Sequence, residues 1–139
     1  MVLVDSSIYV HLLRAGSDPV AQLAERFEVA ELVACDVVRC EVLRGIIRPK
    51  VRADLAMFFD LLVHVTMDHR AWQETEDLAW RLDRTGNILP LTDLMIAVCA
   101  FHAGAELLTR DHHFKMIPRL RLGEWYSKSL NSNECHRSA

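Results

Sequence analysis

The stretch AELLTRDHHF, residues 105–114, carries two signals that lie side by side. Its first half, residues 105–109, is a mostly apolar run that ends in threonine, which is typical of a buried strand. Its second half places an Arg, an Asp and two His residues directly after that strand. The segment MVLVD at residues 1–5 has the same arrangement, because its apolar run ends in Asp5. Two apolar strands that each end at a carboxylate indicate a buried sheet with polar residues along one edge.

Short apolar strands alternate with helical segments through the rest of the chain. Further strands are predicted at residues 31–35, 62–66 and 121–125. Helices are predicted between them, with starts marked by Ser6 or Ser7, Asp18, Asp36, Pro49 and Asp68 and with Gly16 and Gly104 as stops. Strands that alternate with helices favour parallel pairing with helices on both faces. We therefore predict an α/β protein, a three-layer α/β/α sandwich with a central, mostly parallel sheet.

The length of 139 residues suits one domain. We expect that domain to span residues 1–127, followed by a polar, flexible tail at residues 128–139. No apolar run is long enough to cross a bilayer and no signal peptide is evident, so a soluble, cytoplasmic protein without a membrane partner is expected. The formal charge of −3 argues against a general nucleic-acid binder, although it is compatible with a nuclease whose site is acidic.

Several common sites have no sequence support. The four cysteines form no CxxC pair and no zinc spacing, so they are expected to be reduced and mostly buried. Dinucleotide-binding, P-loop and hydrolase-elbow motifs are absent. The tryptophans are expected in the core or at a dimer interface, and four histidines are expected to be structural or on the surface: His11, His64, His69 and His102.

Four carboxylates occur where this fold would direct them to one cleft. Asp5 and Asp111 follow predicted strands, and they share an edge of the sheet if those strands are neighbours. Glu41 lies inside a mostly apolar helix, and Asp93 lies in the first turn of another. Each of them taken alone could cap a helix, pair with a nearby arginine or close a turn. All four together would repel one another unless a divalent cation, which prefers oxygen ligands, is bound among them.

Four segments in this order resemble the signatures of the PIN-domain family: LVDSS, CEVLRG, PLTDLMIA and LLTRDHHF. The resemblance extends to about Lys128, and chains of this size are similar to the VapC toxins of bacterial and archaeal toxin–antitoxin pairs. It implies a ribonuclease that depends on Mg²⁺, with Mn²⁺ as an alternative, and hydrolyses RNA phosphodiesters. Asp5, Glu41, Asp93 and Asp111 would be its catalytic and metal-binding residues. It also implies a homodimer and a cognate VapB-type antitoxin that inserts a peptide into the acidic cleft.

The resemblance also suggests roles for neighbouring polar residues. Ser7, or Ser6, and Thr109 match hydroxyl positions of the family and would orient metal ligands or contact phosphate. His113 stands where many relatives carry a further acid, so it would bind a metal, contact phosphate or face solvent. Imidazole suits manganese or zinc better than magnesium, which leaves the number of metal ions open. Five basic residues are candidates for contacts with the RNA backbone: Arg14, Arg39, Arg44, Arg48 and Lys50.

Two other functions are compatible with the sequence. A PIN-like module that binds RNA or a partner without catalysis would keep the fold and leave the site idle. A phosphohydrolase with Asp5 as its nucleophile is less well supported, because such enzymes usually carry a second Asp where this chain has Ser7.

Overall fold

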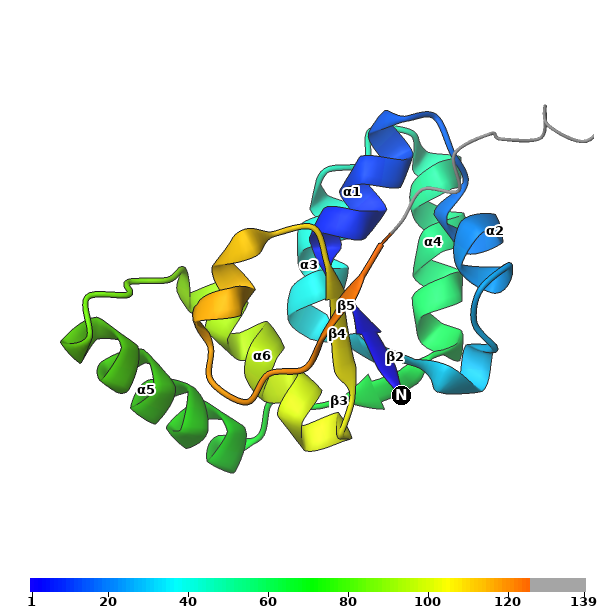
Figure 1. The fold of residues 1–139 in the computed structure, drawn as a ribbon. Coiled ribbons are helices and arrows are strands. Elements are labelled where there is room, and N and C mark those ends of the chain that lie inside the picture. Colours follow the sequence, from blue (N-terminus) through cyan, green and yellow to red (C-terminus); the bar gives the residue numbers. More distant parts are fainter. Residues whose placement is uncertain (126–139) are drawn as a thin grey trace, which may run out of the picture.

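Five parallel strands form the centre of the molecule in the order β3-β2-β1-β4-β5 (Figure 1). Their bounds are β1 Val2–Val4, β2 Leu32–Cys35, β3 Val63–Val65, β4 Glu106–Thr109 and β5 Leu122–Glu124. This computed structural model describes residues 1–125. The predicted tail at residues 128–139 and the last two residues of the predicted domain lie outside the described residues. All five predicted strands are present, and the sheet is entirely rather than mostly parallel.

Six α-helices and two short 3₁₀ helices connect the strands within the described residues. The helices are α1 Ser6–Arg14, α2 Pro19–Ala24, α3 Asp36–Arg44, α4 Pro49–Leu61, α5 His69–Arg84 and α6 Leu91–Ala103, with η1 Val29–Glu31 and η2 His112–Met116 as the 3₁₀ helices. Helices α1 to α4 pack together on one side of the sheet, and α5 and α6 cover the other (Figure 1). The three-layer α/β/α prediction is therefore confirmed.

The central strands are buried on both faces, as a parallel sheet requires. Leu3 of β1 pairs with Val33 of β2 and with Leu107 of β4, and all three side chains are 1% exposed or less. The same core takes in Ile8 of α1 and Ile96 of α6, so helices from both layers are anchored to the sheet. The strand ends that carry the polar residues are thereby held in a rigid frame.

Local signals in the sequence account for most of the helix ends. Asp18 accepts a hydrogen bond from Val20 N at 3.0 Å, and Asp68 accepts one from Ala71 N at 2.8 Å, as expected for N-caps. Gly104 ends α6 in the left-handed conformation with φ of 60°. The predicted serine cap of α1 is wrong, because Asp5 holds the N-cap position.

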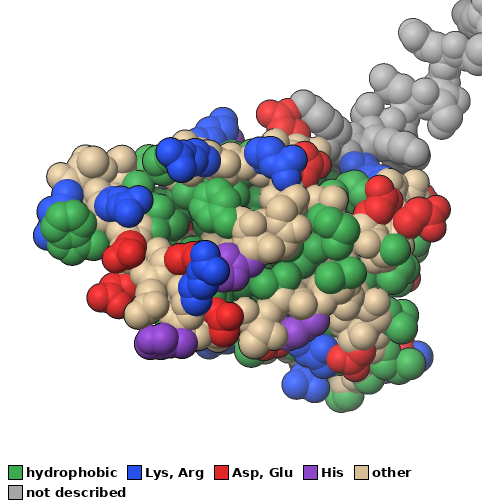
Figure 2. Space-filling view, turned by 90° about the horizontal axis from the view of Figure 1, so that it is seen from below, with side chains coloured by type: hydrophobic (Ala, Val, Ile, Leu, Met, Phe, Trp, Pro, Cys, Tyr) green, Lys and Arg blue, Asp and Glu red, His purple; other side chains and the backbone are tan. Residues whose placement is uncertain are grey.

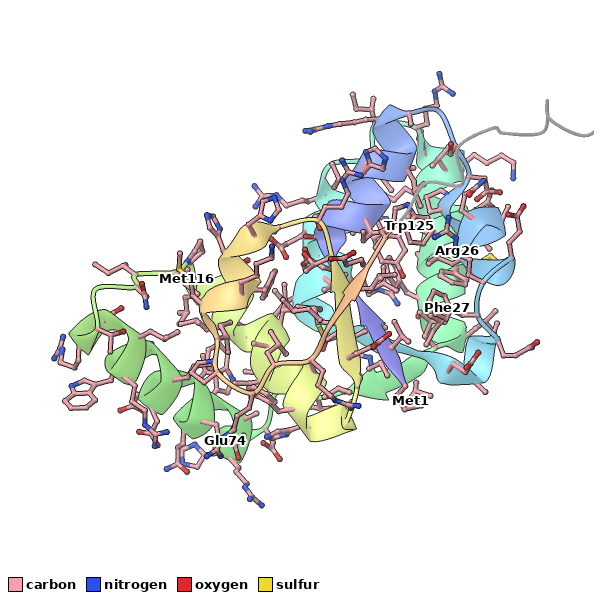
Figure 3. The ribbon with its side chains drawn as sticks, viewed as in Figure 1. Met1, Arg26, Phe27, Glu74, Met116 and Trp125 are labelled. Carbon is pink, nitrogen blue, oxygen red and sulfur yellow. The ribbon has the colours of Figure 1, made fainter. Side chains whose placement is uncertain are left out.

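Helix α5 lies at the periphery and packs mainly on α6 (Figure 1). Glu74 of α5, labelled in Figure 3, accepts a hydrogen bond from Arg70 at 3.2 Å and contacts His102 of α6 at 2.5 Å. Trp72 and Trp80 on the same helix are 44% and 60% exposed. Placement of these two tryptophans in the core is therefore wrong, and the alternative of a dimer interface stays a prediction.

The structure also bears on the expectations for the third tryptophan, the cysteines, the surface charge and membrane-spanning helices. Trp125 is buried and its ring lies 3.8 Å from the guanidinium of Arg26 (Figure 3). Among the described residues, Cys35 and Cys99 are buried and Cys40 is exposed, and none of the three forms a disulfide. On the face seen in Figure 2, acidic and basic side chains are interspersed among hydrophobic ones. No helix within residues 1–125 has the length and apolar character needed to span a membrane.

Candidate active site

The carboxyl ends of β1 and β4 meet at one edge of the sheet. Val4 pairs with Leu108, and the pairing continues one residue further because Asp5 N donates to Leu108 O at 2.9 Å. Asp111 follows two residues after β4 ends at Thr109. The condition set by the sequence, that the two strands are neighbours, is met, and both carboxylates lie at the same edge.

Asp5 is the most deeply placed of the acidic residues, with 3% of its surface exposed. Although it is the N-cap of α1, its carboxylate makes no capping hydrogen bond. Instead, Thr109 Oγ1 donates to Asp5 Oδ2 at 2.8 Å. A buried carboxylate is unfavourable unless it is hydrogen-bonded or paired with a cation, so this bond stabilises Asp5 within the site.

A chain of hydrogen bonds joins α1 to the turn after β4. Because the Thr109 hydroxyl hydrogen is donated to Asp5, Ser7 Oγ is the donor across the 3.3 Å contact with Thr109 Oγ1. Ser7 Oγ accepts from Arg110 N at 3.0 Å, and Thr109 Oγ1 accepts from Asp111 N at 3.0 Å. Ser7 and Thr109 therefore position the two strand-end carboxylates relative to one another.

Glu41 reaches the same site from α3. It is half-buried beside Val42, and its Oε1 lies 3.4 Å from Ser6 Oγ, which is also 3.5 Å from Asp5 Oδ1. Burial raises the pKa of Glu41 above its usual range, and the negative charges of Asp5 and Asp93 raise it further, partly offset by the Ser6 hydrogen bond. Ser6 thus links two carboxylates that repel each other.

Asp93 enters from the first turn of α6, after Pro90 at the N-cap. Burial raises the pKa of Asp93, and the nearby charges of Asp111 and Asp5 add to the shift, while His113 opposes it. His113 Nδ1 lies 3.2 Å from Asp111 Oδ1 and 3.8 Å from Asp93 Oδ2. The imidazole is therefore next to two carboxylates, although 54% of its side chain is exposed.

The donor atoms suit a divalent cation. One ligand atom each from Asp93, Asp111 and His113 lies within 4.8 Å of the others. Glu41 and Asp93 both have raised pKa values because negative charges are close together in partly buried positions. A bound divalent cation would remove that repulsion, and carboxylate oxygens are the ligands that Mg²⁺ and Mn²⁺ accept.

These side chains line one open cavity with a volume of about 680 Å³. All four carboxylates named from the sequence contribute to it, together with Ser7 and His113. Thr109 does not line the cavity, but its hydroxyl is hydrogen-bonded to Asp5 Oδ2 and to Asp111 N. The other lining residues are Ser6, Val10, His11, Arg14, Arg110 and His112.

The sequence assigned no site role to His11 or Arg110. His11 comes one turn after Ser7 on α1, so helical periodicity from Ser7 could have placed it in the cavity. Arg110 stands between Thr109 and Asp111, and its side-chain direction depends on the turn. Of the five basic residues considered as RNA contacts, only Arg14 lines this cavity.

An all-parallel sheet with carboxylates from four segments at one edge defines an α/β protein with a candidate metal-binding active site. Residues 2–120 match the PIN domain, so the chain belongs to the PIN-domain family. This finding confirms the family indicated by the four sequence motifs.

Named relatives and solved structures agree with this assignment. The VapC ribonuclease Mb1587 of Mycobacterium bovis is 28% identical over 127 residues, which cover 86% of this chain and 93% of the relative. Ribonuclease VapC11 of Mycobacterium tuberculosis has the same identity and coverage. The crystal structure of VapBC2 from Rickettsia felis, bound to a DNA fragment from their promoter, contains a chain with a TM-score of 0.74 at 22% identity, covering 91% of this chain and 100% of that one. DNA-bound VapBC from Salmonella typhimurium also gives 0.74, at 21% identity, covering 90% of this chain and 98% of that one.

Proposed function

We propose that this chain is a metal-dependent endoribonuclease and the toxin of a toxin–antitoxin pair. The observation that carries the proposal is the meeting of Asp5, Glu41, Asp93 and Asp111 in one cavity of a PIN-domain protein. The relatives named as VapC ribonucleases support the substrate class. The solved VapBC and toxin–antitoxin complexes support a cognate VapB-type antitoxin as the partner. Pairing of two copies into a homodimer stays a prediction from the family.

Asp93, Asp111 and His113 are close enough to share one Mg²⁺ or Mn²⁺, and Asp5 and Glu41 would complete the metal site at the floor of the same cavity. When bound, the cation would supply a water molecule of lowered pKa and would neutralise charge on the phosphodiester under attack. The protein's own contribution is positioning. Thr109 and Ser7 align Asp5 with Asp111, and Ser6 bridges Asp5 and Glu41. Such preorganised supporting hydrogen bonds keep ligands in place without a penalty during the reaction.

Three carboxylate substitutions test this function directly. Protein freed of antitoxin is incubated with total RNA and either Mg²⁺ or Mn²⁺, and Asp5→Asn and Asp93→Asn are compared with the wild type. Asp83→Asn is the matched control, because Asp83 is exposed on α5 and outside the cavity. Cleavage by the wild type and the control, but not by the two site variants, is expected.

Other outcomes separate the alternatives. Cleavage that persists in EDTA, or equal activity in all variants, would contradict a metal site built from these carboxylates. RNA that binds without cleavage under either metal would favour a binding module. Calorimetric titration with Mn²⁺ should show uptake by the wild type that Asp93→Asn abolishes.

A further inference from the structure

The acidic cavity has a cationic wall. Besides the four carboxylates, it is lined by His11 and Arg14 of α1 and by Arg110, which precedes η2. Because the floor is acidic and the chain carries a formal charge of −3, a polyanion needs local positive charge in order to approach.

The arginines of this wall are available to a ligand. Within residues 1–125, no hydrogen bond or ion pair occupies the guanidinium of Arg14 or Arg110, and both residues are exposed. Two of the other basic candidates are already engaged: Arg39 pairs with Asp60 at 2.5 Å, and Lys50 pairs with Asp54 at 3.1 Å. The other two, Arg44 and Arg48, do not line the cavity. Arg14 and Arg110 are therefore set apart because they both line the cavity and leave their guanidinium groups unpaired within the described chain.

The backbone fixes where these two arginines sit relative to the floor. Ser7, His11 and Arg14 are spaced i, i+4 and i+7, so they follow one face of α1 away from Asp5. At 1.5 Å per residue, Arg14 lies about 10 Å along the helix axis from Ser7. Arg110 is held at the foot of α1, because its backbone N donates to Ser7 Oγ at 3.0 Å. One arginine is thus close to the floor, and the other is well removed from it.

We propose that Arg14 and Arg110 bind the RNA phosphates on either side of the one being cleaved and hold the strand across the acidic floor. This inference rests on the proposed ribonuclease function and assigns two positioning residues to it. Guanidinium groups bind phosphate through paired hydrogen bonds, and a position on a helix limits the freedom of Arg14. Because Asp5 is only 3% exposed, the scissile phosphate has to enter the cavity, and contacts to the flanking phosphates would hold it there.

The salt dependence of RNA binding tests the proposal. Arg14→Gln and Arg110→Gln are each placed in an Asp93→Asn background, which should bind without cleaving. Binding of a short, mixed-sequence, fluorescent single-stranded RNA is then measured at several salt concentrations. Each lost phosphate contact should reduce the slope of log K against log salt by about 0.7 and weaken binding several-fold. Arg52→Gln is the matched control, since Arg52 is exposed on α4, carries the same charge and lies outside the cavity.

A second measurement separates positioning from folding or from the chemical step. With Asp93 restored, Arg14→Gln should raise KM for RNA several-fold and change kcat much less, because the lost contact binds the strand away from the bond that is cleaved, whereas Arg52→Gln should change neither. Slopes for both variants equal to that of Arg52→Gln would overturn the proposal. Intact RNA under every metal would instead count against the nuclease function, and the binding slopes, measured without cleavage, would still decide the role of the arginines.

Discussion

Replacement of Thr109 by valine tests how much the hydroxyl at the centre of the site contributes. Valine keeps the shape of the side chain and removes the donor to Asp5 Oδ2, at 2.8 Å, and the acceptor for Asp111 N, at 3.0 Å. A hydrogen bond to a charged group contributes about 1.5–3 kcal/mol, and Asp5 is too buried for water to replace it fully. The Asp111 N–H is nearer to solvent, so its loss should add little. We expect Thr109→Val to lower the free energy of unfolding by about 2 kcal/mol.

Urea denaturation of the metal-free protein, followed by circular dichroism, measures this change. For a slope of about 2 kcal/mol per molar, the midpoint should fall by about 1 M urea. Thr109→Ser is the control, because it keeps the hydroxyl and loses only a methyl group, and its midpoint should stay much nearer to that of the wild type. RNA cleavage should also fall further in the valine variant than in the serine variant, since Asp5 and Asp111 lose their shared anchor. A valine variant as stable and as active as the serine variant would refute the reasoning.

Two further predictions concern the buried side chain of Phe114 in η2 and the negative charge of Asp93 in the cavity. Phe114 is 1% exposed, so Phe114→Ala should destabilise the protein by about 3–5 kcal/mol in urea, and the midpoint should drop far more than for the exposed neighbour Lys115→Ala. In metal-free buffer at neutral pH, Asp93→Asn should stabilise the fold, because burial and the charges of Asp111 and Asp5 raise the pKa of Asp93. Because folding raises the pKa of Asp93, its ionised carboxylate destabilises the folded state at pH values above that raised pKa. The destabilisation disappears as the pH falls through the raised pKa toward the ordinary range for Asp. Thermal melts should therefore show that Asp93→Asn is more stable than the wild type at neutral pH and that this difference vanishes in acid. Excess Mn²⁺ should make the wild type the more stable protein instead. A stabilisation by Asp93→Asn that is independent of pH would contradict this origin.

Local patterns in the sequence were enough to predict the elements of the fold. Apolar runs of a few residues, caps such as Asp68 and stops such as Gly104 depend on neighbours in the chain, so the strands and helices could be predicted without tertiary contacts. The carboxylates at the ends of β1 and β4 could also be placed, because parallel strands bring their carboxyl ends to one edge. Trp72 shows the limit of such patterns, since it lies on the same helix as the buried Leu82 but is itself exposed, which the local sequence did not reveal.

The contacts that make the site depend on the tertiary structure. Ser7 and Thr109 are 102 residues apart, and their hydrogen bond exists only because β1 and β4 pair in one register. The same long-range packing leaves Arg14 facing the cavity while it engages Arg39 with Asp60. Sequence alone therefore determined which elements form and which carboxylates are candidates for a cation site. Strand order and register decided which side chains meet, because residues far apart in the chain interact only after the sheet has assembled.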